Sequence, residues 1–277
     1  MAKTVLITGA SSGIGRATAE VFLDDDWEVW ATARDETDVA DLAAAGCETA
    51  ELDVTDAGQV ERVVAAVVES AGRIDCLVNN AGYAQFGAVE DISTADLAAS
   101  GQQFDVNVYG PHRLIRQVMP HMRARERGAI VNVSSVAGRL ALPGQGGYAA
   151  SKFALEALSD SLRVEAGEYG IDVVLVQPGP VETEFYDRAQ GEHDDLETTG
   201  AYDWLYTARE DSRLAGIQDA LSVAPGTVAL TILDAANASD PSPRYPVGEG
   251  AKLILMARHL PARWRDAALG VIRKLTG

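Results

Sequence analysis

The sequence predicts an α/β fold with a doubly wound parallel sheet, in a single domain that spans residues 1–277. Three observations support this prediction. Short apolar runs alternate with helical patterns along most of the chain. A glycine cluster separates the first apolar run from the first helical pattern. Residues suited to binding or catalysis follow directly after apolar runs, and the carboxyl ends of parallel strands are where such sheets bind ligands.

The first strand pattern covers residues 3–8 and runs into the sequence TGASSGIG, which precedes a helical run over residues 16–23. A strand, a glycine turn and a helix N-terminus together present backbone N–H groups and the helix dipole to a pyrophosphate. In this arrangement one glycine permits the turn, one lets the phosphates approach and one allows close packing of the helix. The expected cofactor contacts are Gly9, Ser11, Ser12, Gly13, Ile14 and Gly15.

The second strand is predicted over residues 28–33, and Arg34 follows it. An acidic residue at the end of this strand would bind a free ribose 2′-hydroxyl, whereas an arginine accommodates a 2′-phosphate. Ala33 occupies the usual acidic position, so the sequence favours NADP(H) over NAD(H). The alternative is that Arg34 is a solvated turn residue and that Asp35 fills the acidic role.

Two further strands end in polar or small residues that suit the approach of a nucleoside. The strand over residues 48–52 is followed by Asp53 and Val54, and the strand over residues 74–78 by Asn79, Asn80, Ala81 and Gly82. For the second group the alternative is an ordinary Asn/Gly turn. A long helix is predicted over residues 96–125, and Asn107 lies within it as a polar group that needs partners. This amide either is satisfied in the core or orders a water in the site.

A hydroxyl, a phenol and an ammonium follow the next strand, which is predicted over residues 129–135. Tyr148 and Lys152 are four residues apart and share one face of a helix that runs to about residue 169. An ammonium beside a phenol favours the phenolate and lowers the phenol's pKa, so Tyr148 is suited to proton transfer. Ser135 at the strand end can donate a hydrogen bond to an oxygen that gathers negative charge. The alternative is that Tyr148 and Lys152 share an exposed helix face by chance.

The last third of the chain begins with a strand over residues 171–176 and a break that contains Pro178, Gly179, Val181 and Thr183. Residues 184–222 are polar and irregular, with Tyr186, Trp204 and Tyr206 among them, and they suggest a substrate lid. A helix over 227–238 and a short strand near 245–247 follow. The C-terminal segment, residues 251–277, has six basic residues against one acidic residue, and we expect it to pack on its own domain or on a second subunit.

The composition limits the possible partners. The net charge is −18, and only four of the 23 basic residues are lysine. An acidic, lysine-poor surface argues against nucleic acid as a partner and suggests a halophilic, salt-adapted protein; codon bias in a GC-rich genome is the alternative. The two cysteines and four histidines show no metal-binding spacing, so no metal is expected. With no signal-peptide pattern and no bilayer-spanning apolar run, we expect a cytoplasmic homo-oligomer, a dimer or tetramer, for which a membrane contact is not expected.

Residues 3 to 183 resemble the short-chain dehydrogenase/reductase family, whose fold is the Rossmann fold. The resemblance rests on Thr8–Gly15, on Asn79–Gly82, on the interval of thirteen residues from Ser135 to Tyr148, and on Lys152. The stretch from Tyr148 to Glu156 is similar to the branch that acts on retinoids and hydroxysteroids, which implies an apolar alcohol or carbonyl as the small-molecule substrate.

The resemblance implies a catalytic tetrad of Asn107, Ser135, Tyr148 and Lys152. Tyr148 would protonate the substrate oxygen, Ser135 would hydrogen-bond it, Lys152 would hold the ribose hydroxyls, and Asn107 would position a water. It also implies cofactor contacts at Arg34, Asp53, Val54, Asn80, Ala81, Gly82, Tyr148, Lys152, Pro178, Gly179, Val181 and Thr183.

Three other functions are compatible with the sequence. An epimerase or dehydratase acting on nucleotide sugars would need a larger C-terminal domain. A non-catalytic NADP(H)-sensing module would not require Tyr148 and Lys152 together. A surface-binding protein would act through its basic C-terminal segment.

Overall fold

The computed structural model describes residues 2–93, 102–183, 185, 198–214 and 222–276. Seven parallel strands form one sheet in the order β3-β2-β1-β4-β5-β6-β7. The strands are β1 (Thr4–Thr8), β2 (Glu28–Ala33), β3 (Glu48–Glu51), β4 (Cys76–Asn79), β5 (Gly128–Val133), β6 (Ile171–Pro178) and β7 (Arg244–Val247). The predicted doubly wound sheet is confirmed, and the short seventh strand forms its edge beside β6.

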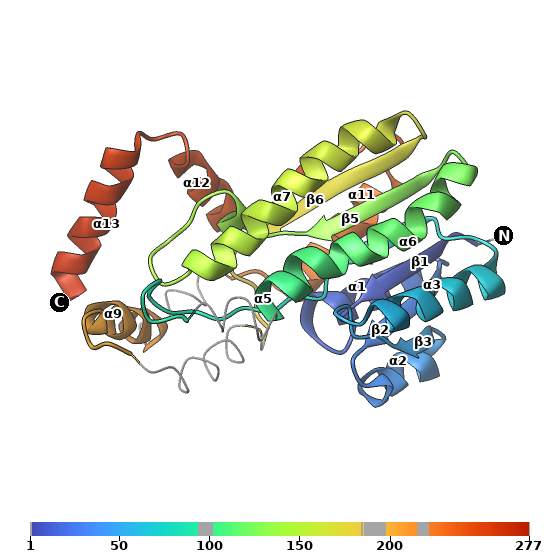
Figure 1. The fold of residues 1–277 in the computed structure, drawn as a ribbon, viewed down its shortest axis with the longest axis horizontal. Helices are drawn as coiled ribbons and strands as arrows, with labels where there is room; N and C mark the ends of the chain where they lie inside the picture. Colours follow the sequence, from blue (N-terminus) through green and yellow to red (C-terminus); the bar gives the residue numbers. More distant parts are fainter. Residues whose placement is uncertain (1, 94–101, 184, 186–197, 215–221, 277) are drawn as a thin grey trace.

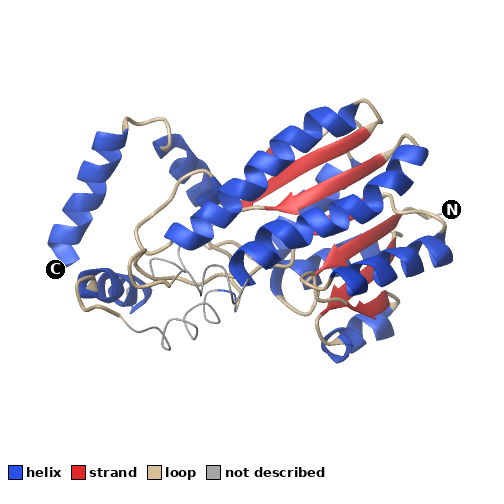
Figure 2. Ribbon diagram, viewed as in Figure 1, coloured by secondary structure: helices blue, strands red, loops and turns tan. Residues whose placement is uncertain are grey.

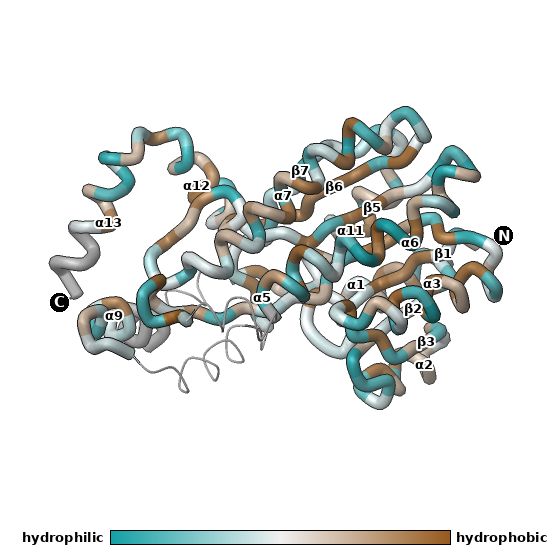
Figure 3. The backbone as a smooth tube through the Cα atoms, viewed as in Figure 1, coloured by the Kyte–Doolittle hydropathy of each residue, from teal (hydrophilic) through white to brown (hydrophobic). Residues whose placement is uncertain are grey.

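Helices cover both faces of the sheet (Figure 2). One face packs against α3 (Ala57–Ala71), α6 (Gly110–Ala124) and α7 (Gly146–Gly167), which lie in front of the strands in Figure 1. The other face packs against α1 (Gly13–Asp24), α2 (Ala40–Ala45) with the preceding 3₁₀ turn η1 (Glu36–Val39), and α11 (Pro225–Asn237). Strands β1, β4 and β5 are therefore buried along their whole length, and the centre of the sheet is predominantly hydrophobic in Figure 3.

Alternate side chains of a strand point to opposite faces, and β1 shows how this fixes the two cores. Val5 and Ile7 join the core under α1 and α11, whereas Leu6 joins the core under α3 and α6. All three side chains are fully buried. Burial of this kind stabilises by about 1.5–3 kcal/mol for each aliphatic side chain. Because a register slip of one residue would exchange the two faces, the pattern holds β1 in place at the centre of the sheet.

The predicted helix over residues 96–125 differs from the structure. Residues 96–101 lie outside the described residues, and the rest divides into α5 (Gln102–Phe104), a π-helical turn η2 (Asp105–Tyr109) and α6. Asn107 occupies the π turn, and π turns inside helices occur frequently at functional sites. The sequence pattern does not indicate the π turn, because the groups that bind the Asn107 side chain, in Tyr83 and Ser151, lie far from it in the chain.

The predicted irregular stretch, residues 184–222, is wrong in one part. Residues 203–214 form a helix, α9 (Asp203–Leu214), while residues 184, 186–197 and 215–221, Tyr186 included, lie outside the described residues. The C-terminal segment breaks near Pro261 into α12 (Glu249–Ala257) and α13 (Ala262–Thr276). Both helices lie at the end of the molecule away from the N-terminus, and α13 packs near α9 (Figure 1). Within the described ranges, no helix is both long and apolar enough to cross a membrane.

Candidate active site

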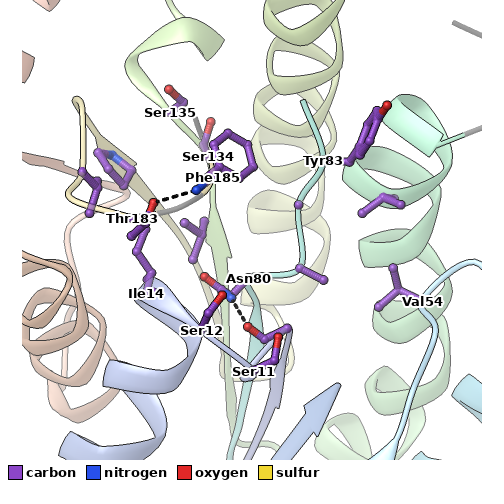
Figure 4. Close-up of a pocket in the computed structure, with 18 of the residues that line it drawn as sticks. Ser11, Ser12, Ile14, Val54, Asn80, Tyr83, Ser134, Ser135, Thr183 and Phe185 are labelled. Atoms are coloured by element: carbon purple, nitrogen blue, oxygen red, sulfur yellow. Dashed lines mark hydrogen bonds between the residues drawn. The ribbon is translucent and has the colours of Figure 1, made fainter. Parts of the chain in front are cut away.

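A cavity of about 400 Å³ opens at the carboxyl ends of the strands. This volume is in the range of small-molecule sites, which are typically about 300–1,000 Å³. Every predicted site residue lines it except Gly15 and Asn107. Figure 4 shows the cavity from the glycine loop at Ser11 and Ser12, past Asn80, to Ser134 and Ser135. The structure thus brings together residues that are up to 174 positions apart, from Gly9 to Thr183.

The glycine loop joins β1 to α1 and forms one end of the cavity. Gly9 has a φ of +68°, and a Cβ at this position would lie 2.9 Å from the Cα of Ala81. A Cβ on Gly15 would collide with the Gly9 carbonyl oxygen, so Gly15 is needed for close packing behind the loop. The first turn of α1 carries no acidic side chain. The loop therefore leaves backbone N–H groups and the positive end of a helix dipole suited to an anion.

Asn80 holds this loop against the neighbouring strand. Its Nδ2 donates to the carbonyl oxygens of Thr8 and Gly9, each at 3.0 Å. The Thr8 hydroxyl in turn accepts from the backbone N–H groups of Asn80 and Ala81, each at 3.0 Å. Although Asn80 lines the cavity, its amide nitrogen is thus engaged in fixing the shape of the loop.

The end of β2 carries the residues expected to select the cofactor. Arg34 lines the cavity and is exposed, whereas Ala33 is buried beside it. The Asp35 carboxylate caps η1, where it accepts from the Thr37 backbone N–H at 2.9 Å and from the Thr37 hydroxyl at 2.7 Å. These hydrogen bonds lower the pKa of Asp35. One oxygen of Asp35 is therefore engaged in its own turn, and the Arg34 guanidinium rather than this carboxylate borders the cavity.

Asp53 and Val54 form the adjacent wall after β3. Asp53 accepts from the Thr55 backbone N–H at 2.8 Å and from its hydroxyl at 2.7 Å, which holds the turn into α3. Val54 packs against Gly110, where a Cβ would lie 2.8 Å from the Val54 side chain. This wall is shaped by close packing, and Leu52 and Thr55 also line it.

Ser135, Tyr148 and Lys152 meet in the same cavity, as expected. Ser135 follows β5 and caps the short 3₁₀ turn η3 (Val136–Gly138), with its Oγ accepting from the Ala137 N–H at 3.1 Å. Tyr148 lies in the first turn of α7 and Lys152 one turn later, and all three residues are buried. The Lys152 Nζ lies 5.9 Å from the centroid of the Tyr148 ring. A cation, a phenol and a hydroxyl are therefore held close together on two elements of the scaffold.

Lys152 is the most perturbed base of the site. Its Nζ donates to the Val133 carbonyl oxygen at 2.9 Å. Burial lowers the pKa of Lys152 to about 8, and the nearby carboxylate of Glu156 opposes this shift. Burial penalises the charged form of a lysine, and strongly shifted groups in clefts are candidates for functional residues.

Asn107 lies directly behind the cavity wall and is 1% exposed. Its Oδ1 accepts from the Tyr83 N–H at 2.9 Å, and its Nδ2 donates to the Tyr83 carbonyl oxygen at 2.8 Å and to the Ser151 hydroxyl at 3.0 Å. The amide thus ties the loop after β4 to α7, and protein groups satisfy it. A role for Asn107 in ordering a water stays a prediction.

The segment after β6 closes the other side of the cavity with Pro178, Gly179, Val181 and Thr183. Thr183 packs against the glycine loop, with its Cγ2 2.9 Å from where a Cβ of Gly13 would lie. Phe185 extends this wall toward the serines in Figure 4. Its ring centroid lies 5.9 Å from that of Tyr148, and Phe86 packs against Tyr148 at 5.8 Å. The Tyr148 ring therefore packs against two aromatic rings.

Sequence reasoning missed several residues that line the cavity: Tyr83, Asp105, Val106, Ser134 and Phe185. Ser134 could have been found from the sequence, because it directly precedes Ser135. The Oγ of Ser134 is buried, and within the described part of the chain it has no hydrogen-bond partner. Tyr83 and Phe185 follow strand ends, which is the signal that indicated their neighbours.

The described part of the predicted lid is anchored beside the site. The Tyr206 hydroxyl of α9 donates to the Asp91 carboxylate at 2.6 Å, and it accepts from the Ala88 N–H at 3.1 Å. The Tyr202 hydroxyl donates to Glu90 at 2.5 Å. Two tyrosines thus hold α9 to the loop after β4. Among the described residues, no group of three or more His, Cys, Asp or Glu side chains is arranged to hold a metal ion.

Comparison with known proteins agrees with this geometry. A sequence model described as short chain dehydrogenase matches residues 3–193. The chain belongs to this family. An uncharacterised oxidoreductase of Escherichia coli K12, YbbO, is 34% identical over 273 residues, which cover 97% of this chain and 94% of YbbO. Mouse 17-beta-hydroxysteroid dehydrogenase type 1 is 37% identical over 261 residues, covering 87% of this chain and 72% of that protein.

Solved structures of the family are similar across the whole fold. A short-chain dehydrogenase from Streptomyces avermitilis has a TM-score of 0.80 and 33% identity, and the match covers 100% of this chain and 97% of the other. ElxO, solved with NADP bound, has a TM-score of 0.75 and 28% identity, with 91% of this chain and 100% of ElxO covered. The protein is therefore an oxidoreductase of the short-chain dehydrogenase family, and the family uses a nicotinamide cofactor.

Proposed function

We propose that this short-chain dehydrogenase uses NADP(H) to interconvert an apolar secondary alcohol and its ketone, or the corresponding aldehyde and alcohol. The observation that carries the proposal is the meeting of Ser135, Tyr148 and Lys152 in one cavity with the glycine loop. A ligand lying along this cavity would place one end at the N-terminus of α1 and the other at Tyr148. This combination of an anion site and a proton-transfer site in one cavity suits a dinucleotide.

The residues that line the cavity fit NADP(H). The N-terminus of α1 would hold the pyrophosphate, and exposed Arg34 would pair with a 2′-phosphate. Ala33 at the usual acidic position is buried, and the Asp35 carboxylate, whose Oδ1 caps η1, does not line the cavity. ElxO, a relative of this fold, is solved with NADP bound.

The chain's own groups would carry the proton chemistry. Bound NADPH supplies the hydride for carbonyl reduction. Tyr148 gives its phenolic proton to the substrate oxygen, and Ser135 donates a hydrogen bond to the same oxygen. The ammonium of Lys152 stabilises the phenolate that Tyr148 becomes. Asn107 holds the Tyr83 loop and Ser151 of α7 in register, which fixes the helix that carries Tyr148.

The surroundings of Tyr148 support an apolar substrate. Ala84, Phe86, Ala137 and Ala149 form a buried cluster with Tyr148, and Phe185, which packs against this cluster, lines the cavity together with Tyr148. A relative of known activity is named as a hydroxysteroid dehydrogenase. Apolar walls with few polar groups are typical of sites for apolar small molecules.

A spectrophotometric assay tests the proposal. Purified protein is given NADPH or NADH with a panel of apolar and polar ketones and aldehydes, and loss of the reduced cofactor is followed. We expect faster turnover with NADPH and with the apolar members of the panel. NADH turnover equal to NADPH turnover would contradict the cofactor assignment, and a preference for polar or sugar carbonyls would contradict the substrate class.

A further inference from the structure

A buried carboxylate lies below the active site on the catalytic helix. Glu156 is one helical turn beyond Lys152 on α7, is 4% exposed and does not line the cavity. Three side chains donate to it: Gln177 Nε2 to Oε1 at 2.7 Å, Arg244 Nε to Oε2 at 2.9 Å, and Arg139 Nη1 to Oε2 at 3.3 Å. Its oxygens are therefore shared among donors from three other parts of the chain.

Each partner of Glu156 lies next to a different part of the site. Arg139 ends the η3 turn that Ser135 begins. Gln177 immediately precedes Pro178 and Gly179, which line the cavity at the end of β6. One carboxylate thus connects the serine turn, the helix that carries Tyr148 and Lys152, and the segment at Pro178 that is expected to contact the cofactor.

The packing around Glu156 leaves little freedom. A Cβ at Gly138 would lie 3.1 Å from the Glu156 Cγ and 2.8 Å from the Ser134 Oγ. The η3 turn is therefore pressed directly onto α7 at this position. A shift of the Glu156 side chain would move the turn that holds Ser135.

Arg244 joins this arrangement to the edge of the sheet. Besides Glu156, its Nη2 donates to both oxygens of Asp160 at 2.7 Å. The same strand, β7, also binds the segment after β6: the Gly179 N–H donates to the Val247 carbonyl oxygen at 3.1 Å. Asp160 lies on the same helix as Glu156 and shares Arg244 with it, and it also pairs with Arg163. Unlike that of Glu156, its side chain is 46% exposed.

We propose that Glu156 is a positioning residue, which sets the spacing between Ser135, the Tyr148–Lys152 pair and the segment at Pro178. The proposal rests on the function proposed above. Its basis is geometric: no other described carboxylate accepts hydrogen bonds from both the η3 turn and the residue before Pro178. Misplacement of reacting groups by about 1 Å can cost up to about 10²-fold in rate.

The test compares Glu156→Gln with Asp160→Asn, a matched control on the same helix that also loses a carboxylate bound to Arg244. A glutamine at 156 keeps the shape but replaces one acceptor oxygen by a donor that faces arginine or Gln177. We expect kcat of Glu156→Gln to fall by about tenfold to 10²-fold. Asp160→Asn should keep kcat within about twofold, because surface ion pairs are typically weak.

The pH profile separates positioning from a general loss of stability. The charged and titratable groups around Lys152 and Glu156 are Arg139 after η3, Arg244 of β7, and Tyr148 and Asp160 of α7. Glu156 favours the charged form of Lys152, so its replacement should move the alkaline limb of the kcat profile to lower pH. A purely structural role would lower the amount of active enzyme and leave the limb in place.

A second variant covers the case in which Glu156→Gln does not fold. Arg139→Gln removes only the link to the serine turn, and the Arg139 side chain is 22% exposed. We expect a smaller fall in kcat than for Glu156→Gln, with NADPH affinity unchanged by fluorescence titration. In the double variant the two losses should be less than additive, because both act through one contact.

The outcomes distinguish the two proposals. A parent enzyme that turns over no carbonyl contradicts the proposed function before any variant is made. An active parent in which Glu156→Gln matches Asp160→Asn in both kcat and pH profile overturns the positioning role alone. Full kcat in Arg139→Gln overturns it as well, even if Glu156→Gln is insoluble.

Discussion

The two halves of the sheet build their parts of the cavity in different ways. The half from β1 to β3 shapes it with backbone: the turn at Gly9, the N-terminus of α1 and close packing at Gly15. The half from β5 to β7, with α7, shapes it with buried polar side chains, among them Ser135, Lys152 and Glu156. Backbone geometry suffices to bind an anion, whereas proton transfer needs side chains in fixed positions and the networks that satisfy them.

This difference predicts that substitutions in the two halves have separable effects. Changes to the proton-transfer hydroxyls of Ser135 and Tyr148, in the half from β5 to β7, should lower turnover and leave cofactor binding nearly intact. Changes in the half from β1 to β3 should act on cofactor affinity.

Replacing the proton donor should have the largest effect. Tyr148→Phe removes one oxygen atom from a ring that packs against Phe86 and Phe185, so the fold should persist. Turnover should fall by at least ~10²–10⁴, the usual contribution of general acid catalysis. Steady-state kinetics and a fluorescence titration of NADPH measure the two quantities. Near-normal turnover on a substrate of the parent enzyme would contradict the assignment of Tyr148.

The two serines after β5 provide the next test. Ser135→Ala should lower turnover by about 10²–10³, as expected for the loss of one oxyanion donor. Ser134→Ala should have a much smaller effect, since we assign the hydrogen bond to the substrate oxygen to Ser135. Single-turnover reduction of one ketone by both variants makes the comparison direct. If the larger loss followed Ser134, the roles of the two hydroxyls would be exchanged.

Cofactor selection should respond in the other half of the sheet. Arg34→Ala removes a charge that would pair with a 2′-phosphate, and NADPH should bind about ten- to a hundredfold more weakly. NADH lacks that phosphate and should bind as before, so it serves as the matched control. Parallel losses for the two cofactors would return Arg34 to the role of a solvated turn residue.

The smallest predicted effect is on stability, through the buried ammonium of Lys152. The pKa of Lys152 is about 8 in the folded protein, below its ordinary value of 10.5. Between these values the unfolded chain binds more protons than the folded protein, so this group makes the protein more stable as pH rises through that window. Lys152→Met should lose this rise, whereas Lys252→Met, at an exposed site, should keep it. Thermal unfolding of the cofactor-free proteins from about pH 7.5 to 10, a range that lies around the two pKa values, would show the difference in the pH dependence of stability. Parallel curves for all three proteins would contradict it.

Local patterns in the sequence were sufficient to predict the sheet and most of the cavity lining. Apolar runs such as that of β1 and glycines such as Gly9 act on their immediate neighbours, so their meaning is visible in the sequence. The π turn at Asn107 was not predictable, because its partners Tyr83 and Ser151 are 24 and 44 positions away. The prediction of an irregular stretch failed at α9 because Tyr202, just before this helix, and Tyr206, within it, bind Glu90 and Asp91, more than a hundred positions earlier.

The separation between Glu156 and Arg244 has a consequence for the order in which the protein assembles during synthesis. The two residues are 88 positions apart, so α7 leaves the ribosome long before the strand that carries its partner. Until then the Glu156 carboxylate lacks one of the two arginines that neutralise it, and an incompletely paired buried charge is unfavourable. The catalytic half should therefore be completed only when β7 adds to the edge of the sheet beside β6.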